Sequence, residues 1–172
     1  MGKKKVNESY YDTFDSPIGT LSLVFTGKIL REIEFNKTTE LIRKGEAPSL
    51  IKKELREYFE NGREEFTQKL GFMKGTEFER SVWLALRGVP YGETRTYKWL
   101  AETVGKPAAS RAVGQALSRN PIPILLPCHR IIESDGSIGG YSAGVDIKRR
   151  LLEIEYYMKL AKKRAKEISN TN

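Results

Sequence analysis

The order of the hydrophobic periodicities constrains the fold of this chain more than any other feature. Three stretches near the N-terminus, residues 10–14, 21–26 and 30–35, have the composition of strands, and turn sequences at 16–19 and 27–28 join them. Strand patterns that follow one another through short turns predict an antiparallel sheet. From residue 50 onward the apolar residues recur at helical spacing instead. This order predicts an α+β fold in which a small sheet precedes a mostly helical region.

The helical pattern suggests where the chain divides. Residues 50–59 form the first predicted helix, which Asn61-Gly62 ends. Its predicted apolar face consists of Leu50, Ile51, Leu55, Tyr58 and Phe59. Residues 71–75 predict a linker, and the sequence from Thr76 to Glu79 has the pattern of a capping box that opens the next helix. We therefore expect two domains, a sheet-and-helix scaffold in residues 1–75 and a mostly helical domain in residues 76–172.

Two short helices joined by a tight turn are expected in the second half. Residues 96–104 and 108–117 predict the helices, and Gly105-Lys106-Pro107 predicts the turn. A helix, a tight turn and a second helix form a DNA-reading unit. The net charge of +8 is concentrated here, because residues 75–172 carry 16 of the 30 basic and only 10 of the 22 acidic side chains. Positive charge favours a polyanion through phosphate contacts, although a basic surface without a partner is an alternative.

The second of these helices is unusual for a reader of the major groove. It consists largely of small residues, among them Ala109, Ala112 and Gly114, and offers few side chains for bidentate base contacts. Small residues let a backbone approach closely, which suits the narrower minor groove. Arg111 interrupts this smooth face. On its own it is also compatible with a solvent-facing or phosphate-binding arginine.

One pair of residues suggests chemistry. Cys128 is the only cysteine in the chain, and His129 beside it is the only histidine. A cysteine reacts as its thiolate, and a free thiol with a pKa of ~8.5 must have its pKa lowered by about 1.5 units to be half ionised at neutral pH. A neighbouring imidazole can supply this, directly or through a water. Because adjacent residues on a regular strand point to opposite faces, we expect an irregular segment here.

The alternative interpretation is a buried bystander. Lone cysteines are often buried and act as small hydrophobes. The apolar residues around this one are Ile122, Ile124, Leu125, Leu126, Ile131 and Ile132. The residues alone leave both interpretations open.

The same counts exclude several classes of protein. One cysteine cannot form an internal disulfide, and one cysteine with one histidine cannot form a four-ligand structural zinc site. No apolar run approaches the length of a membrane span, and the basic start from Met1 to Lys5 has no apolar stretch behind it. We therefore expect a cytoplasmic protein, without a metal ion and without a membrane partner.

The approach Asn120-Pro121-Ile122-Pro123 and the tetrapeptide Pro127-Cys128-His129-Arg130 together resemble the active-site segment of one family. This is the family of O6-alkylguanine-DNA alkyltransferases, also called methylated-DNA–protein-cysteine methyltransferases. The resemblance is specific over residues 76–156 and loose over residues 1–75, where the family has a ribonuclease-H-like domain. It implies direct reversal of DNA damage: one irreversible transfer of the alkyl group from O6-alkylguanine in double-stranded DNA to Cys128, without a cofactor. We expect a prokaryotic monomer that associates with the nucleoid when bound to DNA.

The resemblance also implies roles for individual residues. His129 is expected to act as general base through a water, and Glu155, on a helix predicted over residues 147–158, is expected to orient it, although Glu153 lies two residues away. Asn120 organises the turn before the active-site segment. Arg111 enters the base stack in place of an extruded nucleotide, and Tyr97 helps to rotate that nucleotide outward. The remaining expected contacts are Pro123, Tyr141 and Ser142 in the base pocket, and Lys98, Lys106, Ala109, Ala112, Gly114 and Ser134 on DNA.

Two rival functions remain from the sequence. A non-catalytic DNA-binding regulator or lesion sensor would use the same helices but give no reason for Cys128 beside His129. A thiol hydrolase would use both residues but would need an oxyanion hole and repeated turnover. Ala143 stands where the family often has glycine, which leaves the tolerated size of the O6 substituent open.

Overall fold

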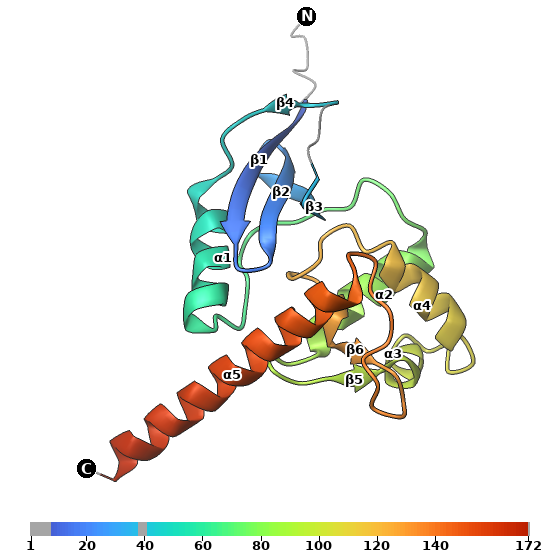
Figure 1. The fold of residues 1–172 in the computed structure, drawn as a ribbon. Helices are drawn as coiled ribbons and strands as arrows, with labels where there is room; N and C mark the ends of the chain where they lie inside the picture. Colours follow the sequence, from blue (N-terminus) through green and yellow to red (C-terminus); the bar gives the residue numbers. More distant parts are fainter. Residues whose placement is uncertain (1–7, 38–40, 172) are drawn as a thin grey trace, which may run out of the picture.

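The computed structural model describes residues 8–37 and 41–171 and has a sheet region followed by a helical region (Figure 1). The basic start at residues 1–5 lies outside the described residues. The strands are β1 (Ser9–Ser16), β2 (Gly19–Thr26), β3 (Ile29–Phe35), β4 (Arg43–Lys44), β5 (Arg95–Thr96) and β6 (Ile131–Ile132). The α-helices are α1 (Ser49–Asn61), α2 (Glu77–Ala85), α3 (Tyr97–Thr103), α4 (Ser110–Ser118) and α5 (Val145–Asn170). The 3₁₀ turns are η1 (Leu86–Gly88) and η2 (Cys128–Arg130).

The first region confirms the predicted antiparallel sheet. β1 pairs with β2 and β2 with β3, both antiparallel, in the order β3-β2-β1-β4. β4 is a parallel addition to β1 that was not predicted, because two charged residues carry no strand pattern. Helix α1 lies beside the sheet and ends at Gly62, whose φ of 64° is left-handed.

The predicted apolar face of α1 is correct except at its first residue. Ile51, Leu55, Tyr58 and Phe59 are buried, whereas Leu50 is 40% exposed. Successive residues on an α-helix are about 100° apart. Leu50 therefore falls outside the stripe that faces the sheet, and Glu54 takes a place within it.

The second region contains the expected helix-turn-helix. Thr76 and Glu79 form a complete capping box at the start of α2. Helices α3 and α4 are joined by a turn in which Gly105 has a φ of 74°, and α4 begins two residues later than predicted. The indole Nε1 of Trp83 donates to the carbonyl of Ala116 over 2.7 Å and so ties α2 to α4.

Two features of the second region were not predicted. β5 and β6 pair in parallel, which brings the start of α3 beside the end of η2. Helix α5 extends from Val145 to Asn170, well beyond the predicted residues 147–158, and its last turns project from the body (Figure 1). No helix in the described ranges has both the length and the apolarity that a membrane crossing requires.

The two regions meet at the segment that precedes Cys128. Buried apolar side chains from both halves form one continuous cluster. The backbone N–H of Ile33 on β3 donates to the carbonyl of Pro121 over 2.9 Å. The boundary near residue 75 stays a prediction, since the core does not stop there.

Candidate active site and DNA-binding surface

The segment before Cys128 is a compact irregular loop that Asn120 braces from within. The Asn120 side chain donates to the carbonyl of Leu126 over 2.8 Å and accepts from the N–H of Ile122 over 3.0 Å. Ile124 has a φ of +75°, which is unusual for a β-branched residue. The chain then enters η2 at Cys128. The segment is therefore irregular, which confirms the expectation drawn from the adjacent positions of Cys128 and His129.

Burial of the thiol changes the expected acidity of Cys128. The residue is 6% exposed. Burial raises the pKa of the Cys128 thiol, and the side chains of Asn120 and Tyr141 and the charge of Lys148 oppose this without reversing it. The lowered pKa that a neighbouring imidazole could supply is therefore not found here. Burial penalises the charged form more than the nearby polar groups favour it.

His129 is fixed in one orientation by a buried carboxylate. Its Nε2 lies 2.7 Å from Glu155 Oε1, and both side chains are almost fully buried. An ionised carboxylate only accepts hydrogen bonds, so Nε2 carries the proton and Nδ1 has the free lone pair. Among the described residues Nδ1 has no hydrogen-bond partner. The imidazole is thus held as a base with its accepting nitrogen unused.

Glu155 is the centre of this network. Besides His129, it accepts from Tyr58 Oη over 2.7 Å, from Arg130 through Nε and Nη2, each at 2.9 Å at its nearest, and from the N–H of Gly92 over 3.1 Å. Burial acts to raise the pKa of Glu155, but the charges and hydrogen bonds of His129 and Arg130 outweigh it and hold the pKa well below its usual range. The carboxylate stays ionised although it is buried. Glu153, the alternative from sequence, is exposed.

A cavity of about 330 Å³ opens beside the thiol. Its lining includes Tyr97, Gly114, Cys128, Tyr141 and Ser142. Burial raises the pKa of Tyr97, as do the charges of Glu133 and Cys128, so its hydroxyl remains a proton donor. This cavity is large enough for a flat heteroaromatic ring.

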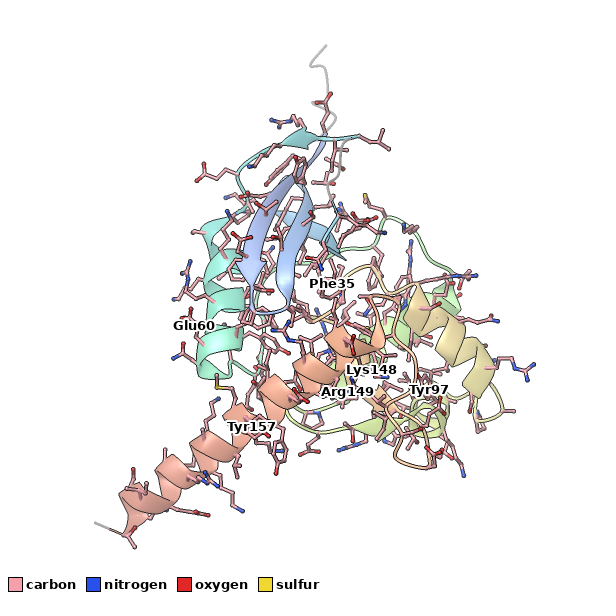
Figure 2. All side chains as sticks on the ribbon, in the orientation of Figure 1. Phe35, Glu60, Tyr97, Lys148, Arg149 and Tyr157 are labelled. Carbon is pink, nitrogen blue, oxygen red and sulfur yellow. The ribbon has the colours of Figure 1, made fainter. Side chains whose placement is uncertain are left out.

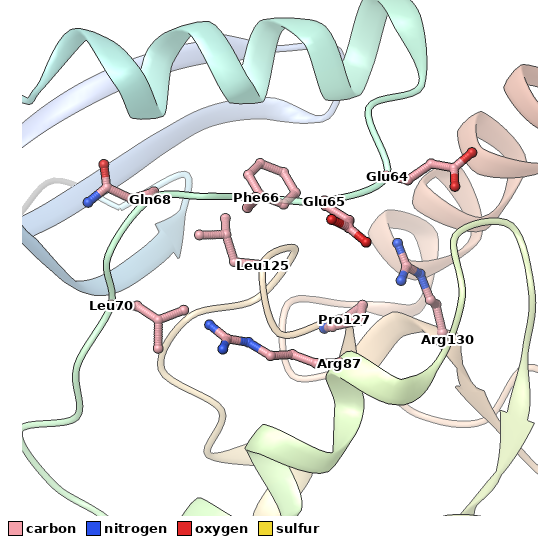
Figure 3. A pocket seen from close by; sticks show the side chains of 9 residues that line it. All are labelled: Glu64, Glu65, Phe66, Gln68, Leu70, Arg87, Leu125, Pro127 and Arg130. Atoms are coloured by element: carbon pink, nitrogen blue, oxygen red, sulfur yellow. The ribbon is translucent and has the colours of Figure 1, made fainter.

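Pro123 does not line this cavity. It borders a neighbouring cavity of about 550 Å³, together with Asn120, Ala143 and residues of β3. Ser142 lines both cavities, so the two are adjacent. A third cavity, of about 270 Å³, lies between the two regions, and Phe66, Leu125, Pro127 and Arg130 border it (Figure 3).

Lys148 is a buried cation near the start of α5, close to Tyr97, which lines the thiol cavity (Figure 2). It is 1% exposed, and its Nζ donates to the carbonyls of Ile131 over 2.6 Å and Gly140 over 3.1 Å. Its Nζ also lies 6.0 Å from the centre of the Tyr97 ring. Burial lowers the pKa of Lys148, while the nearby Cys128 and Glu133 act to raise it. Lys148 therefore connects Ile131 on β6 with Gly140, which lies in the loop that lines the thiol cavity.

Most of the expected DNA contacts are exposed residues of the helical region. Arg111 and Ala112 are exposed on α4, whereas Ala109 and Gly114 are half-buried. The other expected contacts, Lys98, Lys106 and Ser134, are exposed. A Cβ added to Gly114 would lie 3.9 Å from the Tyr97 ring, so the α4 surface borders the thiol cavity.

Comparison with known proteins decides the family. Residues 9–72 match the family model described as 6-O-methylguanine DNA methyltransferase, ribonuclease-like domain, and residues 77–157 match the DNA binding domain of the same protein. The chain is 47% identical over 156 residues to the methylated-DNA–protein-cysteine methyltransferase of Methanosarcina barkeri, which covers 85% of this chain and 96% of that protein. The crystal structure of Mycobacterium tuberculosis OGT in complex with DNA superposes with a TM-score of 0.81 at 41% identity, covering 87% of this chain and 94% of that one.

The chain belongs to the methylated-DNA–protein-cysteine methyltransferase family. Its α+β fold with an N-terminal ribonuclease-like domain is thereby confirmed.

Sequence reasoning about this methyltransferase missed three groups at the site. Lys148 and Glu155 lie seven residues apart on the buried face of α5, so a periodicity analysis of that helix could have found the lysine. Arg130 belongs to the motif, but its role as a partner of Glu155 was not foreseen. Tyr58 had no signal, since an aromatic residue in an apolar helix stripe predicts only core.

Proposed function

We propose that this methyltransferase transfers an alkyl group from O6-alkylguanine in double-stranded DNA to Cys128, once per molecule. The family to which it belongs repairs O6-methylguanine by direct reversal. The observation that carries the assignment to Cys128 is the oriented His129. Its Nε2 is bound to an ionised Glu155, and its Nδ1 is unused in the described residues.

The raised pKa of the thiol sets the first step of the proposed reaction. Cys128 is protonated at rest, so its proton must leave before or during attack. His129 Nδ1 takes this proton, through a water, and Glu155 stabilises the imidazolium that forms. Glu155 is suited to this role because it is kept ionised inside the protein.

The transfer itself is an in-line displacement. The Cys128 sulfur attacks the alkyl carbon, a C–S bond forms, and the bond between that carbon and guanine O6 breaks. The electron pair stays on the guanine, which regains a proton on its ring. Tyr97 is the proposed donor, since the nearby Glu133 and burial keep its hydroxyl protonated. Tyr97 then regains a proton from solvent, and His129 releases to solvent the proton that it took from the thiol. The net change replaces the thiol proton by the alkyl group and adds one proton to guanine.

The product explains why the reaction occurs once. A thioether on Cys128 is stable in water, and none of the described side chains around it can hydrolyse it. The proposed reaction needs no cofactor and leaves the protein alkylated.

Binding must also extract the base from the duplex. The alkylated oxygen is stacked inside DNA, and flipping a nucleotide costs a few kcal/mol, less for a poorly paired lesion. We assign Arg111 to the place of the extruded nucleotide and Tyr97 to its rotation. The small surface around Ala112 and Gly114 would meet the minor groove, whose contacts depend little on sequence. Lys98, Lys106 and Ser134 would contact phosphates.

The flipped base would occupy the cavity beside the thiol. Tyr141 and Ser142 are assigned to its edges, and Asn120 to holding the loop that presents Cys128. Pro123 is assigned to the adjoining cavity, where larger substituents would extend. We place the active protein in the cytoplasm as a monomer.

Intact-mass spectrometry with a duplex that carries one O6-methylguanine tests this proposal. The expected result is a gain of one methyl group per chain, mapped to Cys128. A Cys128→Ser variant is the control and should gain nothing. Tight binding of the duplex without a gain in mass would replace the proposal with lesion sensing, and repeated turnover would contradict the single transfer.

A further inference from the structure

Tyr58 brings the N-terminal region into direct contact with the catalytic network. It lies on α1, 97 positions before Glu155 in sequence, and its Oη donates to Glu155 Oε1 over 2.7 Å. The same oxygen accepts from His129 Nε2 over 2.7 Å. One carboxylate oxygen therefore holds the imidazole and a phenol from the other half of the molecule.

The two carboxylate oxygens of Glu155 accept different numbers of hydrogen bonds. Oε1 faces four donor atoms, Tyr58 Oη, His129 Nε2, Arg130 Nη2 and, at 3.2 Å, Arg130 Nε. Oε2 faces Arg130 Nε at 2.9 Å and the N–H of Gly92. An ionised carboxylate has about four lone-pair sites for its two oxygens, so the donors on Oε1 share the same charge. Every donor besides His129 reduces the charge that remains to hold a proton on the imidazole.

We propose that Tyr58 is a positioning residue that fixes Glu155 and limits how tightly Glu155 holds the proton on His129. This inference rests on the proposed function, in which His129 accepts the thiol proton. Without this competing donor, Glu155 would hold the imidazolium more strongly, and His129 Nδ1 would be less available to accept the thiol proton.

The surroundings of Tyr58 suit this role. The side chain is fully buried, and its ring packs against Phe59, Phe66 and Tyr91 at centroid distances of 5.0, 5.7 and 5.8 Å. These aromatic neighbours hold the ring in place, and the hydroxyl donates to Glu155. Burial raises the pKa of Tyr58, and the charge of Glu155 adds to this, so the phenol remains a donor throughout the working pH range.

The other groups that face this network come from several elements. Arg130 lies on η2 and Tyr91 between η1 and β5, while Cys128 and Tyr141 lie on the thiol side. Tyr91 is a natural control for Tyr58. It is also a buried tyrosine in contact with Arg130, but its hydroxyl has no hydrogen-bond partner among the described residues.

The test compares Tyr58→Phe with Tyr91→Phe in the full-length protein. Single-turnover methyl transfer from a labelled O6-methylguanine duplex is measured between pH 5 and 9. We expect the acid limb of the rate profile of Tyr58→Phe to move to higher pH, by roughly half a unit. The profile of Tyr91→Phe should superpose on that of the wild type.

A direct spectroscopic readout is available because the chain has one histidine. Nitrogen-15 labelling of histidine in tag-free protein gives one imidazole, which titrates in the NMR spectrum without overlap. Its titration should move upward in Tyr58→Phe. Replacing Tyr58 by a fluorotyrosine, which strengthens the phenol as a donor at nearly the same size, should move it downward.

The outcomes separate the inference from the proposed function. A wild type that transfers no methyl group contradicts the proposed function. An active, folded Tyr58→Phe variant whose rate profile and imidazole titration match the wild type contradicts the inference. If Tyr58→Phe does not fold, the fluorotyrosine protein decides, and an unchanged titration there overturns it.

Discussion

Cys128 is the sequence neighbour of His129 and Glu155 is its hydrogen-bond partner, and both are acids removed from water. Burial acts in the same direction on each, since it raises the pKa of any group that becomes negative. The result is nevertheless opposite: the pKa of Cys128 is raised, and that of Glu155 is held well below its usual range. The number and charge of the partners, rather than burial, decide the difference.

The partners of the two groups explain this contrast. Glu155 has the guanidinium of Arg130, the imidazole of His129, a phenol and a backbone N–H within hydrogen-bond distance. Cys128 has neutral polar neighbours and only the indirect charge of Lys148. One acid is therefore prepared in its charged form, and the other is kept neutral until a proton acceptor and a substrate are both present. Such an arrangement would protect the thiol, which in the proposed function reacts only once.

Removing the charge of Glu155 should have the largest effect on this contrast. Glu155→Gln leaves Arg130 buried without its partner, which costs about 3–5 kcal/mol of the free energy of unfolding. The rate of methyl transfer should fall by roughly 10²–10⁴-fold, because His129 loses the group that stabilises its imidazolium. Urea unfolding and single-turnover kinetics measure the two effects.

Glu153→Gln is the matched control for this variant. Glu153 lies two residues away on the same helix and is exposed. Its substitution should change neither the unfolding midpoint nor the rate. If the two substitutions changed the midpoint and the rate equally, the effect would come from altering helix α5 in general. The buried carboxylate of Glu155 would then have no specific role.

Removing the charge of Lys148 tests the other side of the comparison. Lys148→Met keeps an unbranched side chain but removes the cation that opposes the raised pKa of Cys128. The thiol pKa should rise further, and a rise of one unit corresponds to roughly tenfold less thiolate at neutral pH. The pH dependence of iodoacetamide alkylation measures this cleanly, because Cys128 is the only thiol.

Lys166 provides the control for this second variant. It lies on the exposed end of the same helix, so Lys166→Met changes the net charge equally without approaching the site. An alkylation profile that shifts as much in Lys166→Met as in Lys148→Met would assign the effect to overall charge. A profile unchanged in Lys148→Met would remove the lysine from the account of the thiol.

How much of this site the sequence predicts depends on how many residues each sequence pattern covers. The antiparallel strands and the capping box at Thr76 extend over several residues of clear pattern, and both were predicted correctly. β4, β5 and β6 are two residues each, too short for any periodicity. The pairing of β5 with β6 brings Tyr97 beside Cys128, so this part of the site could not be located from local pattern.

The acidity of the thiol could not be inferred from its sequence neighbour for a related reason. The neighbour of Cys128 in sequence is an imidazole, which suggests a lowered pKa, but the effect of burial depends on segments far away in the chain. Tyr58 was missed for the same reason, since its partner lies 97 positions later. The roles of Cys128, His129 and Glu155 stay predictions until the methyl transfer is measured.

The smallest expected effect concerns the dependence of stability on acid. The pKa of Glu155 is lower in the folded protein than its ordinary value of 4.5, so its contribution to stability is complete above about pH 4.5. As the pH falls below this value, the unfolded chain takes up a proton first, and the contribution declines until the pH reaches the folded pKa. Urea midpoints of the wild type and Glu155→Gln, measured from pH 6 down to pH 3, should therefore converge as the pH falls. Subtracting the pH dependence of one protein from that of the other removes the contributions of other carboxylates whose pKa is lowered, such as Asp12. A difference between the midpoints that stays constant over this range would mean that Glu155 has the same pKa in the folded and the unfolded protein. The opposite pKa shifts of Glu155 and Cys128 would then not be supported.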